Sequence, residues 1–361
     1  MKNFVKKNTV MKNIIRVSLL AVLAAALVLS LCGCSGLGVE VGPVYGNAGK
    51  YTAGDAVLTE PVDSIDVEWS RGNVELAYSE GSEITLSERS ETELTDEIRL
   101  HWWVDGSTLR VHYAASGQII TGKLEKNFTL TLPAGFSLSS LKISATSGEV
   151  NVQDTVAESV ELNVSSGMIS AGLQADDVKL DSTSGTVSVN VNARNTVRIS
   201  TTSGKISATV QAGEIKAEST SGRVSLTQTG SSDKIELHTT SGNIEAVLDT
   251  VGTVKASSTS GSVSLQGKKI QKAEAGCTSG TITFSADETP QRLILDSTSG
   301  DLKIYLPADA SFTAEVDQTS GDFFYEDFAL KKQEDHYIAG DGSASFSLHS
   351  TSGDIRLNAA K

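Results

Sequence analysis

The chain is short of aromatic residues, of proline and of positive charge. Aromatics make up 5% of its 361 residues, five residues are proline, and 30 Lys and Arg face 44 Asp and Glu, for a formal charge of −14. Nucleic acid is excluded as a partner, because phosphate binding needs clustered Lys and Arg. The 32 glycines, with abundant Ser and Thr, favour many short strands and tight turns over packed helices.

Long apolar runs are also scarce, and the one that stands out lies near the start. Five basic residues and no acid precede or flank residues 17–31, which are almost wholly apolar and too short for an ordinary membrane span. The run ends in Leu31-Cys32-Gly33-Cys34, which resembles the lipobox of bacterial lipoproteins. The resemblance implies a signal peptide over residues 1–33, cleavage after Gly33 and a diacylglyceryl group on Cys34. The alternative is an uncleaved N-terminal anchor.

Either outcome predicts an exported chain held at the outer face of the cell membrane, or of the outer membrane in a host with two. Removing residues 1–33 removes five positive charges, so the remaining charge is −14 − 5 = −19. Anionic headgroups repel such a body, which leaves the acyl chains to hold it. Residues 34–50 are predicted to be the lipidated cysteine and a flexible, glycine-rich tether. Only Cys34 and Cys277 remain, so no disulfide framework can be drawn.

A Thr/Ser-Ser-Gly triplet recurs through the rest of the chain. Eight intervals cover the 152 residues from the first copy to Gly300, a mean of 19 residues, and the last two intervals are 21 and 32 residues. The glycines of the triplet are Gly148, Gly167, Gly185, Gly204, Gly222, Gly242, Gly261, Gly280, Gly300, Gly321 and Gly353. A period of this size is typical of repeat architectures.

Four positions in every copy are apolar: seven and five residues before the glycine, and two and four after it. All 44 of these positions in the eleven copies are apolar, against 39% for the chain, and the residues between them are mostly polar. This alternation indicates a strand, a turn and a second strand in each repeat. A unit of 19 residues cannot bury its own apolar face, so we expect a β-solenoid with one coil per repeat. The alternative, an antiparallel meander, would need more strands than one open sheet holds.

Two outward columns are expected if the coils stack in register. The Thr and Ser of the triplet would form a hydrogen-bonded hydroxyl column that caps the turns. Six residues before the glycine, opposite charges alternate in five of seven adjacent pairs. The column comprises Lys142, Glu161, Lys179, Arg198, Lys216, Glu236, Lys255 and Glu274.

The two ends of the chain differ from its middle. Residues 51–140 are predicted to be an N-terminal β region, in which residues 65–76 match the repeat without Thr-Ser and form a degenerate first coil. Residues 141–361 are predicted to hold the repeats, with an insertion near 322–345. Aromatic residues concentrate at both ends, where they serve either as the core of end caps or as a partner-binding surface. The candidate partner surface consists of Phe323, Phe324, Tyr325, Phe328 and Tyr337.

The repeated Thr-Ser-Gly occurs with the stretch LPADASF…TSGDF from Leu306 to Phe323 and with the closing GDGSASFSLHSTSGDIRL. Together they resemble the bacterial "putative adhesin" family, also called toast-rack proteins. The resemblance covers residues 60–358. It implies a β-strand-repeat fold and a place in the cell envelope and, for some members, a role in envelope stress or the response to antimicrobial peptides. It supplies no catalytic residue.

The sequence offers little chemistry beyond this. The five histidines lack metal-ligand spacing and are expected to be solvated, and Cys277 is expected to be a packed small residue. Asp301, Asp322 and Asp354 directly follow the last three glycines. Stacked carboxylates would repel one another, which a Ca²⁺ ion would relieve; the alternative is a solvated acidic edge. No other cofactor is expected.

These observations favour a non-enzymatic, lipid-tethered surface module that binds a partner or acts as a scaffold. Its negative charge predicts attraction to cationic peptides or basic surfaces. The alternative is a polysaccharide-active β-solenoid enzyme, which would need carboxylates converging in a groove.

Overall fold

The computed structural model describes residues 39–121 and 123–360, and these residues fall into two compact units. In the first, β1 (Val39–Val41) pairs antiparallel with β9 (Ile119–Thr121). The second comprises residues 42–118 and 124–361 and holds all the other strands. The predicted signal peptide and Cys34 lie outside the described residues. Among the described residues, no helix has the length and apolar character needed to cross a membrane.

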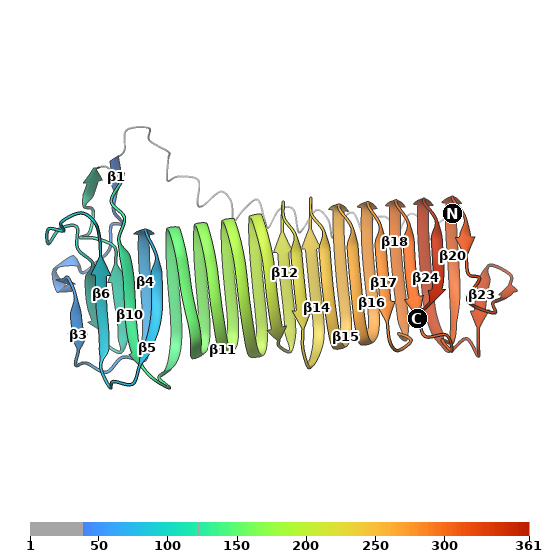
Figure 1. The fold of residues 1–361 in the computed structure, drawn as a ribbon, viewed down its shortest axis with the longest axis horizontal. Coiled ribbons are helices and arrows are strands. Elements are labelled where there is room, and N and C mark those ends of the chain that lie inside the picture. The colour runs from blue at the N-terminus through green and yellow to red at the C-terminus, as the bar shows by residue number, and fades with distance from the viewer. Residues whose placement is uncertain (1–38, 122, 361) are drawn as a thin grey trace. The chain divides into compact units, whose positions relative to one another are not determined.

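The second unit is almost entirely β-structure (Figure 1). Its one helix is the 3₁₀ turn η1 (Ala48–Lys50). Its strands are β2 (Thr52–Ala53), β3 (Ala56–Leu58), β4 (Ser64–Arg71), β5 (Val74–Ser79), β6 (Ile84–Arg89), β7 (His101–Asp105), β8 (Thr108–His112), β10 (Asn127–Pro133), β11 (Ser137–Gln211), β12 (Glu214–Ser219), β13 (Val224–Gln228), β14 (Ser231–Thr239), β15 (Ile244–Ser260), β16 (Val263–Ser279), β17 (Ile282–Ala286), β18 (Arg292–Ser299), β19 (Leu302–Leu306), β20 (Phe312–Ser320), β21 (Phe323–Phe324), β22 (Lys331–Gln333), β23 (His336–Ala339), β24 (Ala344–Ser352) and β25 (Ile355–Ala359).

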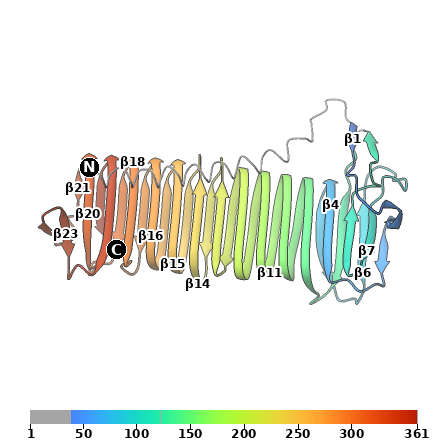
Figure 2. The same ribbon diagram turned by 180° about the vertical axis from the view of Figure 1, so that it is seen from behind.

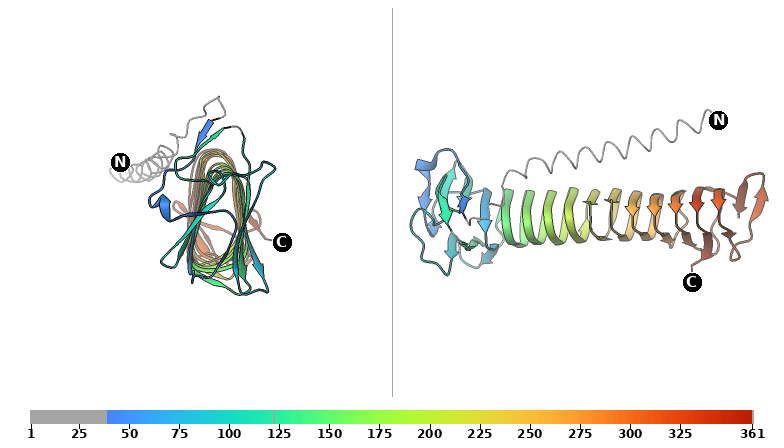
Figure 3. Two further views of the ribbon diagram at one scale, coloured as in Figure 1. Left: turned by 90° about the vertical axis from the view of Figure 1, so that its left-hand side faces the viewer. Right: turned by 90° about the horizontal axis from the view of Figure 1, so that it is seen from above.

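Each repeat forms one coil whose two strands pair in parallel with the same strands of the next coil. Before the glycine, Ile215 of β12 lies opposite Ile235 of β14, which lies opposite Val254 of β15. After the glycine, Val224 lies opposite Ile244. Parallel pairing from coil to coil confirms the predicted β-solenoid and rules out an antiparallel meander. Viewed along the stack, the coils superpose around one elongated cross-section (Figure 3), and strands cover both broad faces (Figure 2).

The predicted inward positions form the core. In the Gly204 coil, Val197, Ile199, Ile206 and Ala208 are all buried. The long element β11 runs through four glycine turns, and three of these glycines, Gly148, Gly167 and Gly185, have positive φ. Each coil therefore covers the apolar side of its neighbour, and burial of these side chains stabilises the stack.

The glycines run in a file along one edge, where neighbouring turns touch. A Cβ atom on Gly204 would lie 1.7 Å from the carbonyl oxygen of Gly185, and one on Gly222 would lie 1.7 Å from that of Gly204. No side chain fits such an approach. The spacing of the coils thus explains why every copy carries glycine at this position.

The last coils do not stack in the order of the chain, which differs from the stack of consecutive repeats that the sequence predicts. β24 lies between β18 and β20, and β25 lies between β19 and β21 (Figure 1). The coil of Gly353 is thus inserted between those of Gly300 and Gly321. The residues of the expected insertion form part of the outer coil and the β22–β23 hairpin, which pairs with the free edge of β20.

The other end has the same kind of order. β4 lies between β8 and β11, and β5 lies between β10 and β11. The degenerate first coil is thus the second coil in space, and a later segment of the chain covers it. Residues 42–50, part of the expected flexible tether, differ from that expectation because they belong to the second unit, where the Tyr45 ring stacks on His112 with centroids 3.8 Å apart.

Candidate functional site

The hydroxyls that cap the turns come from the residue before the Thr-Ser-Gly triplet. Thr202 and Ser203 of one triplet are exposed, whereas the preceding Thr201 is buried. At this preceding position, the hydroxyl of Thr239 donates to the carbonyl of Gly222 (3.3 Å), and that of Ser258 donates to Gly242 (3.0 Å). The hydroxyl column expected for the triplet itself is therefore corrected: the buried hydroxyls lie one residue earlier. Thr239 and Ser258 cap a neighbouring turn, whereas the hydroxyls of Ser182, Thr201, Ser219 and Ser297 in the same column have no hydrogen-bond partner among the described residues.

Cys277 occupies this inner column. Its thiol donates to the carbonyl of Gly261 at 2.9 Å, and burial raises the pKa of the thiol. A buried thiol with a raised pKa is a poor nucleophile, so the geometry agrees with the packing role expected for Cys277.

The three aspartates expected to hold Ca²⁺ do lie on adjacent coils, in the spatial order Asp301, Asp354, Asp322. Two of the three carboxylates are used by the backbone of the next coil. The N–H of Asp354 donates to Asp301 Oδ1 (3.0 Å), and the N–H of Asp322 donates to Asp354 Oδ1 (3.1 Å). The Asp322 N–H bond and the Arg356 side chain lower the pKa of Asp354. No group of three metal-ligating side chains able to hold an ion is found among the described residues, so the Ca²⁺ hypothesis is not supported.

The same bond recurs with asparagine elsewhere in the stack. The N–H of Glu149 donates to Asn73 Oδ1 (3.0 Å), and that of Ser262 donates to Asn243 Oδ1 (3.0 Å). A neutral amide therefore fulfils the same role as the carboxylates. The column after the glycine caps the backbone between coils, and negative charge is not required for it.

The five aromatic residues of the predicted partner surface separate into different environments. Phe328 is buried against Phe312, with ring centroids 5.9 Å apart, and Arg356 lies over the ring of Phe324 at 4.3 Å. Only Phe323, Tyr325 and Tyr337 form a mutually packed, partly exposed cluster, with centroid distances of 4.9 to 5.7 Å. We call these three residues the end cluster.

The end cluster is the exposed end of the core. Phe323 and Tyr325 occupy the two inward positions after Gly321, and Tyr337 of the hairpin covers them from outside. They stay partly exposed, with Tyr325 37% accessible, because no further coil stacks on this end. This position at the end of the stack agrees with a role of the end cluster in the core of the end cap. It also leaves an apolar surface that a partner can reach.

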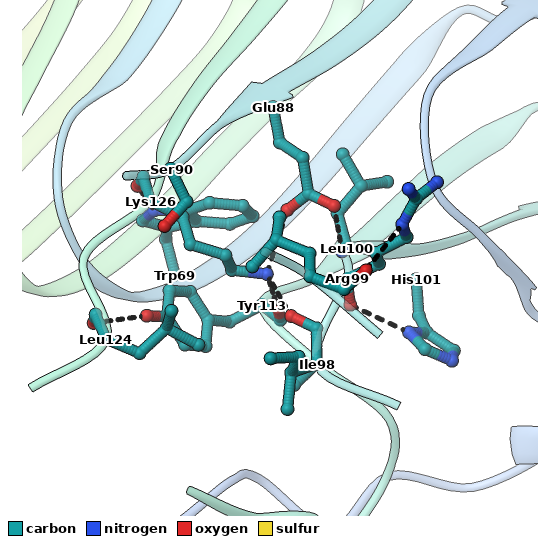
Figure 4. A network of polar contacts seen from close by, with 12 residues as sticks. Trp69, Glu88, Ser90, Ile98, Arg99, Leu100, His101, Tyr113, Leu124 and Lys126 are labelled. Carbon is teal, nitrogen blue, oxygen red and sulfur yellow. Dashed lines mark hydrogen bonds and ion pairs between the residues drawn. The ribbon is translucent and has the colours of Figure 1, made fainter. Parts of the chain in front are cut away.

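A buried ion pair in the N-terminal cap is the most polar feature of the interior (Figure 4). Lys126 Nζ lies 2.9 Å from Glu88 Oε2, with both side chains almost fully buried. The ammonium also donates to the carbonyl oxygens of Ile98 (2.6 Å) and Tyr113. Burial lowers the pKa of Lys126, and Glu88 opposes this shift. Three acceptors around one ammonium are the arrangement of a structural pair.

Sequence reasoning missed this pair, although a signal was present. Lys126 has the same inward phase as Phe128 and Leu130, and Glu88 has that of Ile84 and Leu86. A charge at an inward strand position needs an opposite charge inside. The phase of the two strands could have identified both residues.

A second polar cluster surrounds His112, which is buried and not solvated as expected. The hydroxyl of Tyr51 lies 3.1 Å from His112 Nε2, and Glu68 Oε2 lies 3.2 Å from Nδ1. The hydrogen bond from His112 lowers the pKa of Glu68. Since Tyr45 covers the ring, the cluster fixes the entering chain to the coils and leaves the imidazole enclosed.

The two broad faces of the stack carry different side chains. On the face before the glycine, charges pair between coils: Lys179 lies 2.9 Å and Lys142 4.0 Å from Glu161, and Lys255 lies 3.0 Å from Glu274. On the face after the glycine, the third position is mostly small and uncharged. From Gly148 to Gly280 its residues are Asn151, Ser170, Ser188, Ser207, Ser225, Glu245, Ser264 and Thr283, and in the last three copies they are Lys303, Phe324 and Arg356.

A recess of the described surface lies where the inserted coil enters the stack. It has a volume of about 700 Å³ and includes Asp287, Glu288 and Asp309 in its lining. All three carboxylates are exposed, and Glu288 pairs with Lys269 at 3.1 Å. A catalytic acid normally needs burial to raise its pKa. This recess therefore does not favour a polysaccharide-active enzyme.

Comparison with known proteins identifies the repeats. The sequence model of the family Toastrack DUF4097 matches residues 62–275 and 257–358. A structure described as "a putative cell adhesion protein" from Clostridium sporogenes is 8% identical, covers 85% of this chain and 100% of its own, and has a TM-score of 0.15. One described as "a putative adhesin" from Bacteroides fragilis is 13% identical, covers 84% and 95%, and has a TM-score of 0.29. No curated protein matches the chain.

Proposed function

The chain belongs to the Toastrack DUF4097 family, and from that premise we propose that it is a non-enzymatic, adhesin-like binding or scaffold module of the cell envelope. The observation that carries this proposal is the register of the coils. It sets equivalent outward side chains in straight files about 4.8 Å apart, on a scaffold whose core is continuous. Regular files suit many weak, simultaneous contacts with an extended partner.

The proposed anchor is the lipid on Cys34, which would place the stack outside the membrane. The formal charge of −19 after removal of residues 1–33 supports a body held clear of anionic headgroups (−14 − 5). The tether would be shorter than the sequence suggests, because Tyr45 already contacts the coils.

We further propose that the partner is cationic, such as a basic peptide encountered under envelope stress. Support comes from the connecting turns, which join one coil to the next at the edge opposite the glycines. They are rich in acids: Asp154, Asp176, Asp177, Asp233, Asp249, Asp287, Glu288 and Asp309. Arg194, Lys268 and Lys269 of the same edge pair with Asp176, Asp249 and Glu288. The acids named still outnumber these bases, and a net negative charge on a rigid edge attracts basic ligands at long range.

Binding of a synthetic oligolysine peptide to the full chain tests this proposal. Binding should weaken strongly as NaCl rises, and Asp249→Asn with Asp287→Asn and Glu288→Gln should weaken it further. Thr202→Ala with Ser203→Ala, on the opposite edge, is the matched control and should leave binding unchanged. Salt-independent binding, or equal loss in the control, would refute the cationic partner. Capture of envelope material by the chain at high salt would still support the adhesin-like module.

A further inference from the structure

The order of coils at the C-terminal end differs from that of a simple winding. After β19 the chain passes over one position, forms the outer coil with β20 and β21, and then makes the β22–β23 hairpin. It returns to fill the open position with β24 and β25. In β24, Phe346 lies opposite Leu293 on one side and Ala314 on the other. The last described strands thus have both edges paired.

The inserted coil is also the best-covered part of this end. Phe346, Leu348, Ile355 and Leu357 are all buried, and the Phe346 ring stacks on Phe312 with centroids 4.5 Å apart. The glycine file follows the same order, since a Cβ on Gly353 would meet the oxygen of Gly300, and one on Gly321 the oxygen of Gly353. Withdrawing this coil exposes apolar surface on two neighbouring coils at once.

The chain enters the stack in the same manner. β4 is its first long strand, and it has β8 on one side and β11 on the other. Trp69 of β4 is buried, and its indole N–H donates to the carbonyl of Lys126 at 2.8 Å. The short strands β2 and β3 before it pair with β7 and β6 at the outside. The entering chain is therefore covered by a cap formed later in the sequence.

We propose that this order makes the stack a force-bearing element locked at both ends, a property that goes beyond the proposed binding function. In a solenoid wound in chain order, the pulled strand belongs to the outermost coil and has one paired edge. Such a coil peels away alone and releases about 65 Å of chain at roughly 3.4 Å per residue. Here β25 at one end must break two ladders and two core contacts together. At the other end the same holds for β4 once the short strands β2 and β3 are released, so the ends do not unravel coil by coil.

The outer coil is closed by a separate device. The β22–β23 hairpin pairs with β20, and its free edge strand β22 carries the exposed Lys331 and Lys332. Charged edge strands prevent pairing with further chains. The hairpin thus ends the stack while the inserted coil holds it.

Single-molecule force measurement on the full chain tests the lock. One handle is fixed at mid-stack through Ser221→Cys, an exposed position, and the second is attached either after residue 361 or at Glu326→Cys in the exposed outer coil. We expect extraction of β25 from the 361 handle to need at least about twice the force of peeling β21 from the 326 handle, because β25 is paired on both edges, with β19 and β21, whereas β21 is paired with β25 alone. Equal or lower force, or release in single-coil steps from the 361 handle, would overturn the proposal.

Hydrogen exchange on the unaltered chain gives an independent test. Amides of β24 and β25 should exchange as slowly as those of β16 at mid-stack, and at least about tenfold more slowly than those of β21 and of residues 316–320, the part of β20 beyond its pairing with β23. Exchange in β24 and β25 as fast as in residues 316–320 would show that the inserted coil opens freely, and the lock would be rejected.

Discussion

At the scale of single residues, the closest fit in the molecule is that of the triplet glycines, where one turn lies on the next. The oxygen of Gly185 occupies the place where a Cβ of residue 204 would be. We predict that Gly204→Ala lowers the free energy of unfolding by about 2–3 kcal/mol, because the coils must separate locally to admit the methyl group. Chemical denaturation measures this.

The matched control is Gly276→Ala, in the same stack. The nearest atom to a Cβ there is the Asp296 oxygen at 4.0 Å. This change should stay within about 0.5 kcal/mol of the parent chain. Similar losses for both variants would show that glycine is needed for a reason other than the contact between turns.

The Lys126–Glu88 pair gives a second prediction at this scale. Lys126→Met leaves a buried carboxylate and two carbonyls without their partner, so we expect a loss of about 3–5 kcal/mol. Adding Glu88→Leu should recover part of it, because the buried charge is then removed, while the two carbonyls and the N–H of Leu100 stay without partners. Thermal unfolding of the single and the double variant measures both effects. A double variant as unstable as Lys126→Met alone would mean that the pair is not the source of the stability.

The aspartate column gives a third prediction. Asp354→Ala removes the acceptor of the Asp322 N–H and should lower the melting temperature, whereas Asp354→Asn keeps an acceptor oxygen and should lower it less. Millimolar Ca²⁺ should not shift the melting temperature of the parent chain, since two of the three carboxylates are already used. A rise in melting temperature with Ca²⁺ that both variants abolish would restore the metal hypothesis.

Inward residues could be predicted one by one from the alternation of period two, and the burial of Val197, Ile199 and Ile206 confirms it. Partners were harder to predict. Glu88 lies 38 residues before Lys126 (126 − 88), and no local pattern links the two strands. Asp301 and Asp354 were predicted to repel each other. Their bonds to backbone N–H groups could not be predicted, because these bonds depend on a coil order that the repeat spacing does not contain.

At the scale of the element, the paired charges on the strand face link stability to pH. Lys179 lowers the pKa of Glu161 through a hydrogen bond, as Lys234 does for Glu236. Groups with a lowered folded pKa stabilise the fold above their unfolded pKa of about 4.3, and this contribution is lost as pH falls through the lower folded value.

We therefore predict a free energy of unfolding that is nearly constant between about pH 6 and 8 and falls below about pH 4. Glu161→Gln should reduce the acid-induced loss by less than about 1 kcal/mol, since the pair is partly exposed. Asp296 has a pKa raised by burial and acts in the opposite sense. Denaturation across the pH range checks the sign: a stability that rises on acidification would contradict the role of these pairs.

The elements themselves were largely predictable, and their order at the ends was not. The 19-residue period predicts the strands and the glycine turns. It does not reveal that β24, and not β20, lies next to β18 in the stack, because both coils carry equivalent apolar positions. The 32-residue spacing before Gly353 signals an interruption, yet a skipped position and a simple insertion give the same spacing.

At the scale of the whole coil stack, the account depends on each coil lying on the next in a constant register. Exposed triplet serines offer label sites along one edge: Ser184, Ser260, Ser299, Ser320 and Ser352. At about 4.8 Å per coil, backbone distances from Ser184 should be about 19 Å to Ser260 and about 29 Å to Ser299. Ser352 should be about 34 Å away and Ser320 about 38 Å, although Ser320 precedes Ser352 in the chain.

Pulsed electron–electron double resonance on pairs of nitroxide labels measures these distances. We predict that the distance from Ser184 grows by a constant increment per coil as far as Ser299. We also predict that Ser352 lies nearer to Ser184 than Ser320 does. Distances that do not grow in equal steps would contradict the stacked coils, and Ser320 measured nearer than Ser352 would contradict the inserted one.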